Sequence, residues 1–397
     1  MNNRQLFLQH VAQTSDAPIA LEICKAEGIY LYDSSGKKYI DGISGFSVNN
    51  IGHGNPLVIK AIQEQSTAYM HTIVYGEFIQ QPQVQFAHLL TQNLPSSLNC
   101  VYFTNSGTEA IEGAMKLAKR ITKKSKIISC YNAYHGSTQG ALSIMGGDYW
   151  QQNYRPLLPD IFRFNFGSDE LIDAIDKNTC CVIIEPVQAE AGVVATTKEW
   201  FKKLREKCNQ HCVVLIMDAI QTGFGRTGFL WGFEPLEVEP DILVIGKALG
   251  GGLPLGAFIA DKKLMHTLAY NPVLGHITTF GGNPVCCAAG MAAFKFLLEA
   301  NIIKDADSKG KFLKEKLSNQ PLIQKINQVG LWLAIEFETE EICREIAHTC
   351  VTKGLVTDWF LFAPKSIRLA PPLIITQHQL ETIVEIVVES IHEVAFS

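Results

Sequence analysis

The sequence predicts an α/β fold built on a mostly parallel β-sheet. From about Ala61 onward, short apolar segments alternate with segments of helical periodicity, which is the pattern of repeated strand-helix units. Five of the apolar segments end at polar, glycine or aromatic residues, as strands do at the carboxyl edge of an open sheet. The chain has 397 residues, a length that suggests two or three domains and a large buried core.

Each of these five predicted strands leads to residues that can carry chemistry. The strands are Val101–Phe103, Lys126–Cys130, Cys181–Ile184, Val213–Met217 and Ile242–Gly246. The residues that follow them are, in the same order, Ser106-Gly107, Tyr134-His135, Glu185, Asp218 and Lys247. Because ligands of open α/β sheets bind at the carboxyl ends of the strands, we expect these side chains to share one site.

The pattern changes after about Asn283 and predicts a smaller α+β domain. Its expected elements are helices over 284–299 and 305–317, a strand over 331–337, a helix ending before Gly354, a strand through 367–369, and a final helix from Thr376. A hairpin around 28–36 is expected to join this domain. The predicted division is an N-terminal segment, 1–45, that packs with the small domain, a large ligand-binding domain, 46–282, and the small domain, 283–397.

Composition excludes several other classes of protein. The net charge is −5 and no run of Lys and Arg occurs, so neither nucleic acid nor an anionic membrane is an expected partner. The N-terminus lacks the apolar core of a signal peptide and no membrane span is expected, which predicts a cytoplasmic protein. The 11 cysteines are scattered without metal-site spacing, so buried thiols are expected and metal is not. Gly223–Gly228 fits a dinucleotide-binding pattern, but no helix is predicted after it.

The turn after the first strand has the features of a phosphate site. Ser106, Gly107 and Thr108 stand where the strand ends and a long amphipathic helix begins. Backbone N–H groups at a helix start bind anions, and a glycine allows a phosphate to come close. The alternative is a capping box, with Ser106 as the cap and Glu109 three residues later. The two interpretations are compatible.

Asp218 and Lys247 each end a strongly apolar strand. A buried acid needs a partner, and a protonated pyridine nitrogen would be one, although an aspartate that caps a turn explains the same position. An apolar setting lowers the pKa of a lysine and makes its amine a nucleophile for carbonyl groups. The glycines at 250–252 leave room for a bulky adduct on Lys247. The alternative is a lysine that reaches out to solvent.

These motifs, with others in the same order, resemble the class III aminotransferases. This group of fold-type-I enzymes uses pyridoxal phosphate and contains ornithine, acetylornithine and 4-aminobutyrate aminotransferases. The resemblance extends from Tyr30 to the end of the chain. The matching motifs are Gly52–Pro56, Asn105–Ala110, Tyr134–Gly136, Glu185–Gln188, Asp218 with Gln221–Gly223, Gly246–Gly252, Thr279–Pro284 and Arg368–Pro372. The resemblance implies a large domain with a mostly parallel sheet flanked by helices, and a smaller α+β domain.

The resemblance also implies a role for each matching residue. Lys247 forms a Schiff base with the cofactor and then moves a proton, while Asp218 keeps the pyridine nitrogen protonated. Arg368 grips the α-carboxylate of a substrate, and Glu190 pairs with this arginine when the substrate has none there. The residues expected to bind the cofactor are Ser106, Gly107, Thr108, Tyr134, His135, Glu185, Gln221 and Thr279, the last of them from the other subunit of a homodimer with shared active sites.

The expected reaction moves an amino group from an amine or ω-amino acid to an oxo acid, with 2-oxoglutarate as the acceptor, by a ping-pong mechanism. One alternative is acetylornithine or ornithine aminotransferase activity specifically. Another is decarboxylation, racemisation or amino-group migration by an enzyme of the same fold. A third is a binding protein without catalysis, against which the intact Lys247, Asp218 and Arg368 argue.

The substrate end departs from the better-known members of the family. Ser137 stands where they usually have the arginine that binds a carboxylate far from the reacting amine, and a hydroxyl cannot replace that cation. Phe46 matches a position that tunes substrate choice. The aromatic segment 358–362 either lines the pocket or packs between domains, and packing is the favoured interpretation.

Overall fold

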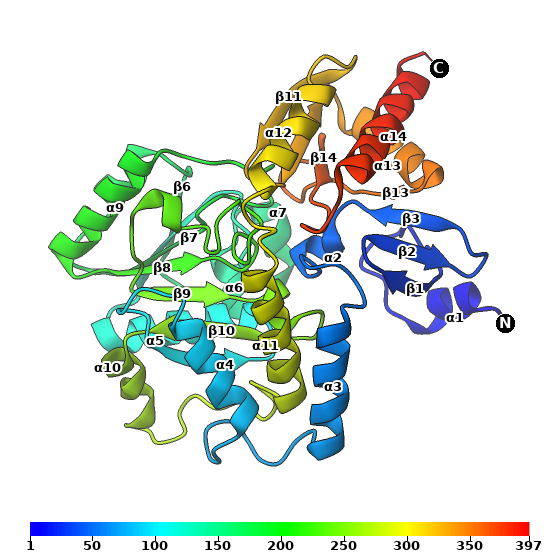
Figure 1. Cartoon of the computed structure of the whole chain (residues 1–397). Helices are drawn as coiled ribbons and strands as arrows, with labels where there is room; N and C mark the ends of the chain where they lie inside the picture. Colours follow the sequence, from blue (N-terminus) through cyan, green and yellow to red (C-terminus); the bar gives the residue numbers. More distant parts are fainter. Residues whose placement is uncertain (397) are drawn as a thin grey trace.

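The protein is built around a seven-stranded β-sheet, seen in a computed structural model that describes residues 1–396 (Figure 1). The strand order is β4-β10-β9-β8-β7-β5-β6. The strands are β4 (Cys100–Thr104), β5 (Lys126–Cys130), β6 (Ile161–Phe164), β7 (Thr179–Ile184), β8 (Val214–Asp218), β9 (Ile242–Ile245) and β10 (Gly256–Ala260). All run parallel except β10, which pairs antiparallel with both of its neighbours. The predicted α/β fold with a mostly parallel sheet is confirmed.

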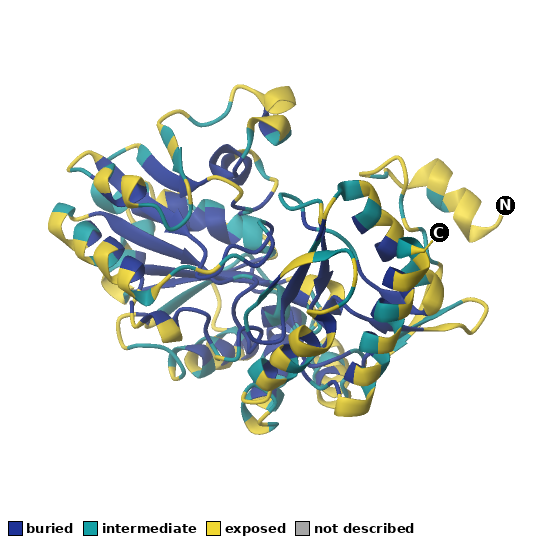
Figure 2. Ribbon diagram, turned by 90° about the horizontal axis from the view of Figure 1, so that it is seen from above, coloured by how far each residue is buried: buried dark blue, intermediate teal, exposed yellow. Residues whose placement is uncertain are grey.

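Helices cover both faces of this sheet. The helices in the first three quarters of the chain, not all of which touch this sheet, are α1 (Asn3–His10), α2 (Ser44–Ser47), α3 (Pro56–Ala68), α4 (Gln81–Thr91), α5 (Gly107–Thr122), α6 (Gln139–Ile144), α7 (Asp148–Gln151), α8 (Asp169–Asp173), α9 (Lys198–His211), α10 (Lys262–Met265) and α11 (Pro284–Glu299). Short 3-10 turns are η1 (Gln152–Tyr154), η2 (Glu234–Leu236), η3 (Lys247–Gly250) and η4 (His266–Ala269). Seen from above, the strands form a buried layer between partly exposed helices (Figure 2).

The strands alternate their side chains between two apolar cores, because successive residues of a strand point to opposite faces. Val182, Leu215 and Leu243 belong to the core that includes residues of α4, α9 and α11. Ile183 and Ile216 belong to the core on the other face, which is filled by α5. Burial on both faces explains why these strands read as continuous apolar segments in the sequence.

Two smaller sheets and three helices complete the fold. One sheet has the order β1 (Ile23–Glu27), β2 (Tyr30–Asp33), β3 (Lys38–Asp41) and β13 (Leu355–Val356). The other has the order β11 (Ile323–Gln328), β12 (Leu333–Phe337) and β14 (Ser366–Leu369). The helices are α12 (Ala306–Leu317), α13 (Glu340–Lys353) and α14 (Gln377–Ala395). Because β3 pairs with β13, the start of the chain lies against its last quarter (Figure 1). This pairing supports the proposed grouping of residues 1–45 with the small domain.

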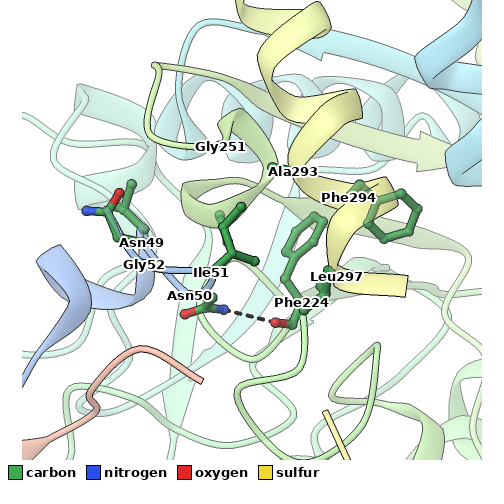
Figure 3. Close-up of a pocket in the computed structure, with 11 residues that line it drawn as sticks. Asn49, Asn50, Ile51, Gly52, Phe224, Gly251, Ala293, Phe294 and Leu297 are labelled. Carbon is green, nitrogen blue, oxygen red and sulfur yellow. Dashed lines mark hydrogen bonds between the residues drawn. The ribbon is translucent and has the colours of Figure 1, made fainter. Parts of the chain in front are cut away.

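A buried arginine makes hydrogen bonds to segments that are far apart in the sequence. Arg226 is fully buried and donates to Asn50 Oδ1 at 2.7 Å and to the carbonyl oxygens of Leu331 and Pro371, both at 2.8 Å. Asn50 in turn donates to the carbonyl oxygen of Phe224 at 3.0 Å, beside α11 (Figure 3). The cavity between residues 48–52, Phe224 and α11 has a volume of only about 10 Å³, so these segments pack closely. Burial lowers the pKa of Arg226 to about 9.

Candidate active site

A cavity of about 460 Å³ opens at the carboxyl edge of the large sheet. This volume is in the usual range for small-molecule sites. Its lining brings together residues that follow β4, β5, β7, β8 and β9, as the sequence predicted. The predicted site residues among them are Gly107, Thr108, Tyr134, His135, Ser137, Glu185, Asp218, Gln221 and Lys247. Parallel strands deliver their carboxyl ends to one edge, which places residues far apart in sequence around this cavity.

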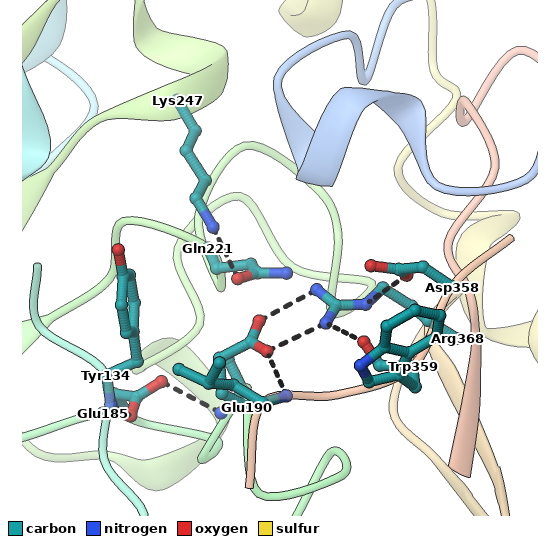
Figure 4. A network of polar contacts seen from close by, with 10 residues as sticks. Tyr134, Glu185, Glu190, Gln221, Lys247, Asp358, Trp359 and Arg368 are labelled. Carbon is teal, nitrogen blue, oxygen red and sulfur yellow. Dashed lines mark hydrogen bonds and ion pairs between the residues drawn. The ribbon is translucent and has the colours of Figure 1, made fainter. Parts of the chain in front are cut away.

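Lys247 is the first residue of η3 and its backbone adopts a left-handed conformation, with φ 48°. A non-glycine residue held in this region stores strain, and such residues concentrate at functional sites. Its Nζ donates to Gln221 Oε1 at 2.6 Å (Figure 4). Burial of the ammonium lowers the pKa of Lys247 to about 8, partly offset by the charge of Glu190. A substantial fraction of the amine is therefore uncharged near neutral pH and able to attack a carbonyl carbon.

Asp218 ends β8, is buried, and has a polar partner for each oxygen. Its Oδ2 lies 2.7 Å from His135 Nδ1, and its Oδ1 accepts from the N–H of Ile220 at 3.0 Å. The histidine Nε2 is buried without a hydrogen-bond partner in the described chain. His135 therefore holds the carboxylate in place from one side, while the cavity lies open on another.

The turn into α5 forms a tight cradle. The hydroxyl of Ser106 accepts from the N–H of Glu109 at 3.3 Å, which confirms Ser106 as the helix cap. The capping box is incomplete, because the Glu109 carboxylate accepts from the N–H of Asn105 instead, at 2.8 Å. Ser106 does not line the cavity; Gly107 and Thr108 do. A Cβ on Gly107 would lie 2.7 Å from Ile220 Cδ1, so any larger residue would have to displace this side chain.

The opposite wall comes from the loop after β5. Gly136 has φ 125°, and a Cβ there would lie 2.3 Å from Thr108 Oγ1. Thr108 Oγ1 is 2.7 Å from Thr138 Oγ1, so hydroxyls from two loops meet at the helix start. The sequence interpretation did not include Thr138. Hydroxyls and free N–H groups at a helix N-terminus are suited to a phosphate.

Glu185 organises the floor of the cavity. Its oxygens accept from the N–H groups of Tyr134 at 3.4 Å and Ala189 at 2.9 Å (Figure 4). Burial, with repulsion from Asp218, raises the pKa of Glu185 well above its ordinary value. The Tyr134 hydroxyl lies 3.2 Å from Ser137 Oγ.

Arg368 and Glu190 form a buried bidentate pair on the substrate side. The Nη1–Oε1 and Nη2–Oε2 distances are both 2.9 Å, and Arg368 is fully buried (Figure 4). The rings of Phe360 and Phe46 lie 4.2 and 4.9 Å from the guanidinium carbon. Arg368 lowers the pKa of Glu190 against the opposing effect of burial, so the pair is charged.

This pair lines a second cavity of about 550 Å³. Phe46 and residues 12–19 of the N-terminal segment form other walls. Trp359 and Leu361 also line it, whereas Phe360 is completely buried. The aromatic segment 358–362 thus both lines a pocket and packs. Phe46 has φ 63° and is 42% exposed.

One predicted residue stands apart from the site. Thr279 is exposed and does not line either cavity of its own chain.

One residue of the site, Asp358, received no role from the sequence. It lines the second cavity, and its Oδ1 lies 3.4 Å from Arg368 Nε. A long-range backbone contact brings the two residues together, since the N–H of Arg368 donates to the Asp358 carbonyl oxygen at 2.8 Å.

The residues present fit pyridoxal phosphate. The cradle at Gly107 and Gly136 suits its phosphate, and Asp218 suits its ring nitrogen. The buried Nε2 of Gln221 has no partner in the described chain and is available to a ring substituent. Lys247 supplies the amine.

Comparison with known proteins agrees with this geometry. The model of the class-III aminotransferase family matches residues 11–391. The chain is 37% identical to the acetylornithine aminotransferase of Methanopyrus kandleri over 386 residues, covering 96% of each chain. It is 34% identical to ornithine aminotransferase 1 of Staphylococcus aureus over 398 residues, covering 97% of this chain and 98% of the relative.

Solved structures show the same fold. The ornithine aminotransferase of Toxoplasma gondii superposes with a TM-score of 0.91 at 28% identity, covering 98% of this chain and 94% of that one. A thermostable (S)-enantioselective omega-transaminase of Thermomicrobium roseum gives a TM-score of 0.89 at 26% identity, covering 98% and 97%. The fold is that of the fold-type-I transferases. The chain belongs to the class-III aminotransferases and is a pyridoxal-phosphate-dependent aminotransferase.

Proposed function

We propose that this aminotransferase takes the amino group from an amine or ω-amino acid and gives it to an oxo acid, with 2-oxoglutarate as the acceptor. The observation that carries the proposal is the buried, bidentate Arg368–Glu190 pair. An arginine already neutralised by a carboxylate of its own chain suits a donor without an α-carboxylate. When Glu190 moves aside, the same guanidinium can bind the α-carboxylate of an oxo acid. Two substrates that alternate at one site imply ping-pong kinetics.

The residues of the chain divide the work of the reaction. Pyridoxal phosphate, when bound, supplies an aldehyde for amines and a ring that withdraws electrons from the substrate carbon. Lys247 would hold the cofactor through its amine and, once the substrate amine has freed it, would carry the proton that the transfer moves. Asp218 keeps the ring nitrogen protonated, with His135 fixing its carboxylate 2.7 Å away. Gly107 and Thr108 bind the phosphate.

Ser137 favours an amine over a donor that carries a carboxylate at the end far from the reacting amine. Among the described residues that line the two cavities, Lys247 and Arg368 are the only lysine and arginine. A distal carboxylate therefore has no guanidinium to meet beside Tyr134. The names of the relatives favour a second candidate, transfer from acetylornithine or ornithine specifically.

A panel of amino donors tests these alternatives. Each donor is mixed with the purified enzyme, and the loss of absorbance of the lysine-bound cofactor is followed. Amines without a distal carboxylate should react fastest. If ornithine or acetylornithine reacts as fast as any other donor, the interpretation of Ser137 is wrong. Steady-state rates with donor and 2-oxoglutarate should give the parallel reciprocal lines of a ping-pong mechanism; intersecting lines, or release of carbon dioxide from the donor, would favour other chemistry of this fold.

We further propose a homodimer with shared active sites, in the cytoplasm. Exposed apolar side chains surround Thr279 on two neighbouring segments: Met70, Phe78, Ile79, Val273, Leu274, Ile277 and Phe280. The segments are held together, since Asn283 donates to the Met70 carbonyl oxygen at 3.0 Å. A patch of this kind is suited to a second copy that brings its Thr279 to the phosphate. Eleven free cysteines favour a reducing compartment, and no helix in residues 1–396 is long and apolar enough to cross a membrane.

Sedimentation velocity tests the assembly. The wild type should sediment as a dimer, and Ile277→Asp with Phe280→Asp should sediment as a monomer that binds the cofactor more weakly. A wild type that stays monomeric at micromolar concentration would exclude shared sites.

A further inference from the structure

Arg368 has a second acidic neighbour that the exchange with Glu190 does not use. Asp358 Oδ1 lies 3.4 Å from Arg368 Nε, on the edge of the guanidinium away from Glu190 (Figure 4). Both atoms are buried, and neither has a hydrogen-bond partner of good geometry. Asp358 therefore acts on Arg368 through its charge more than through a hydrogen bond.

The Arg368 guanidinium has several contacts besides the Asp358 carboxylate. The rings of Phe360 and Phe46 lie at 4.2 and 4.9 Å from its guanidinium carbon, and strand β14, which carries it, pairs with β12. Its Nη2 also lies 3.5 Å from the Trp359 carbonyl oxygen. These contacts, together with the bidentate pair with Glu190, hold the guanidinium without the charge of Asp358.

The charge balance has a consequence for substrate binding. One guanidinium between two ionised carboxylates leaves the cluster with a net charge of −1. When an oxo acid binds, the Glu190 carboxylate leaves Arg368 but stays nearby. The carboxylate of the oxo acid is then the third negative charge around the Arg368 guanidinium, after Glu190 and Asp358. Repulsion over this short, poorly hydrated distance weakens binding of the carboxylate.

We propose that Asp358 is a specificity-determining residue that weakens binding of carboxylate substrates at Arg368 and so biases the enzyme toward donors without an α-carboxylate. This inference rests on the proposed role of Arg368 as the carboxylate-binding residue. It adds a residue to that site and predicts how acceptor affinity depends on pH.

The dependence on pH follows from the groups around Asp358. Burial raises the pKa of Asp358 to about 6, against the opposing effect of Arg368 and with a further rise from Glu190. From α13, the Cys343 thiol faces Asp358, and burial raises the pKa of that thiol to about 12, so it stays neutral. Asp358 therefore gains its charge as the pH rises through about 6, and carboxylate binding should weaken over that interval.

The test measures binding of glutarate, a dicarboxylate that cannot accept an amino group, to the purified holoenzyme by calorimetry between pH 5.5 and 8. Wild-type affinity should fall by about fivefold across this range, as expected for a partly screened charge. Asp358→Asn should bind glutarate about fivefold more tightly at pH 7.5 and lose most of the pH dependence. Asp358→Glu, which keeps the charge, should retain that dependence.

Arg368→Gln, which removes the positive charge, separates this inference from the proposed function. If Arg368→Gln leaves glutarate affinity unchanged, Arg368 does not bind carboxylates, and both proposals are overturned. If Arg368→Gln weakens binding but Asp358→Asn binds glutarate no more tightly than the wild type at pH 7.5, only the role of Asp358 is overturned. Thermal melting of each variant checks that it is folded. If Asp358→Asn is misfolded, the glutarate affinities of the wild type and Asp358→Glu are still compared across the pH range. A wild-type affinity that does not change with pH would then contradict the proposal.

Discussion

Replacing Arg226 by methionine should destabilise the protein strongly, although this residue lies outside the active site. The side chain is fully buried and donates to four acceptors, on Ser44, Asn50, Leu331 and Pro371. Methionine fills much of the same volume but donates nothing. If each acceptor left without this donor costs about 1 kcal/mol, at the low end of the usual range, the free energy of unfolding falls by about 4 kcal/mol. The variant also recovers the cost of burying the guanidinium, visible in its lowered pKa, so about 4 kcal/mol is the upper bound of the loss.

Urea unfolding of the holoenzyme in excess cofactor, followed by far-UV circular dichroism, measures this change. Arg155→Met is the matched control, because Arg155 is 57% exposed and pairs with Asp148 at the surface. The control should lose no more than about 0.5 kcal/mol. If the unfolding midpoint of Arg226→Met equals that of Arg155→Met, the hydrogen bonds of Arg226 do not stabilise the packing of these segments.

Three further predictions concern the active site. The rate at which apoenzyme recombines with pyridoxal phosphate should rise with pH around a midpoint near 8, because Lys247 must lose its proton; cofactor absorbance measures the rate, and a midpoint above 10 would contradict the assigned environment. Glu190→Gln should lower the KM of the oxo acid severalfold and slow the reaction of amine donors, and steady-state kinetics with both substrates measures this. Unchanged kinetics would mean that Glu190 does not move away from Arg368 during the reaction. Gly136→Ala should weaken cofactor binding about tenfold in a spectroscopic titration, because the new Cβ would lie 2.3 Å from Thr108 Oγ1 at φ 125°; Gly76→Ala, in open space, controls for the φ strain alone.

Most of the large sheet could be predicted because its strands are buried on both faces. The predicted strand over 126–130 and helix over 284–299 match β5 and α11 residue for residue. The reversed direction of β10 was not predicted, because a buried strand has the same apolar pattern whichever way it runs. The apolar strand of the small domain begins at 333 rather than 331.

Some residues of the candidate site could likewise be predicted from the sequence, and others could not. Lys247 and Asp218 are visible in the sequence because a charged residue after an apolar strand is unusual. The contact between Asp358 and Arg368 depends on backbone pairing between two segments that no local pattern specifies, as shown by the bridge from Trp359 to Ile367. The roles of Ser106 and Thr279 remain predictions, since neither lines the cavity in a single chain.

The position of β4 at one edge of the large sheet has a consequence for the order in which the protein is made. Residues 100–104 pair with residues 256–260 of β10, so β4 is synthesised long before its partner. At ordinary translation rates the delay is about ten to thirty seconds. During that time the start of α5 has no completed sheet to rest on, and its apolar face is open to wrong contacts. The phosphate cradle of this enzyme can therefore take its final form only after β10 has been synthesised.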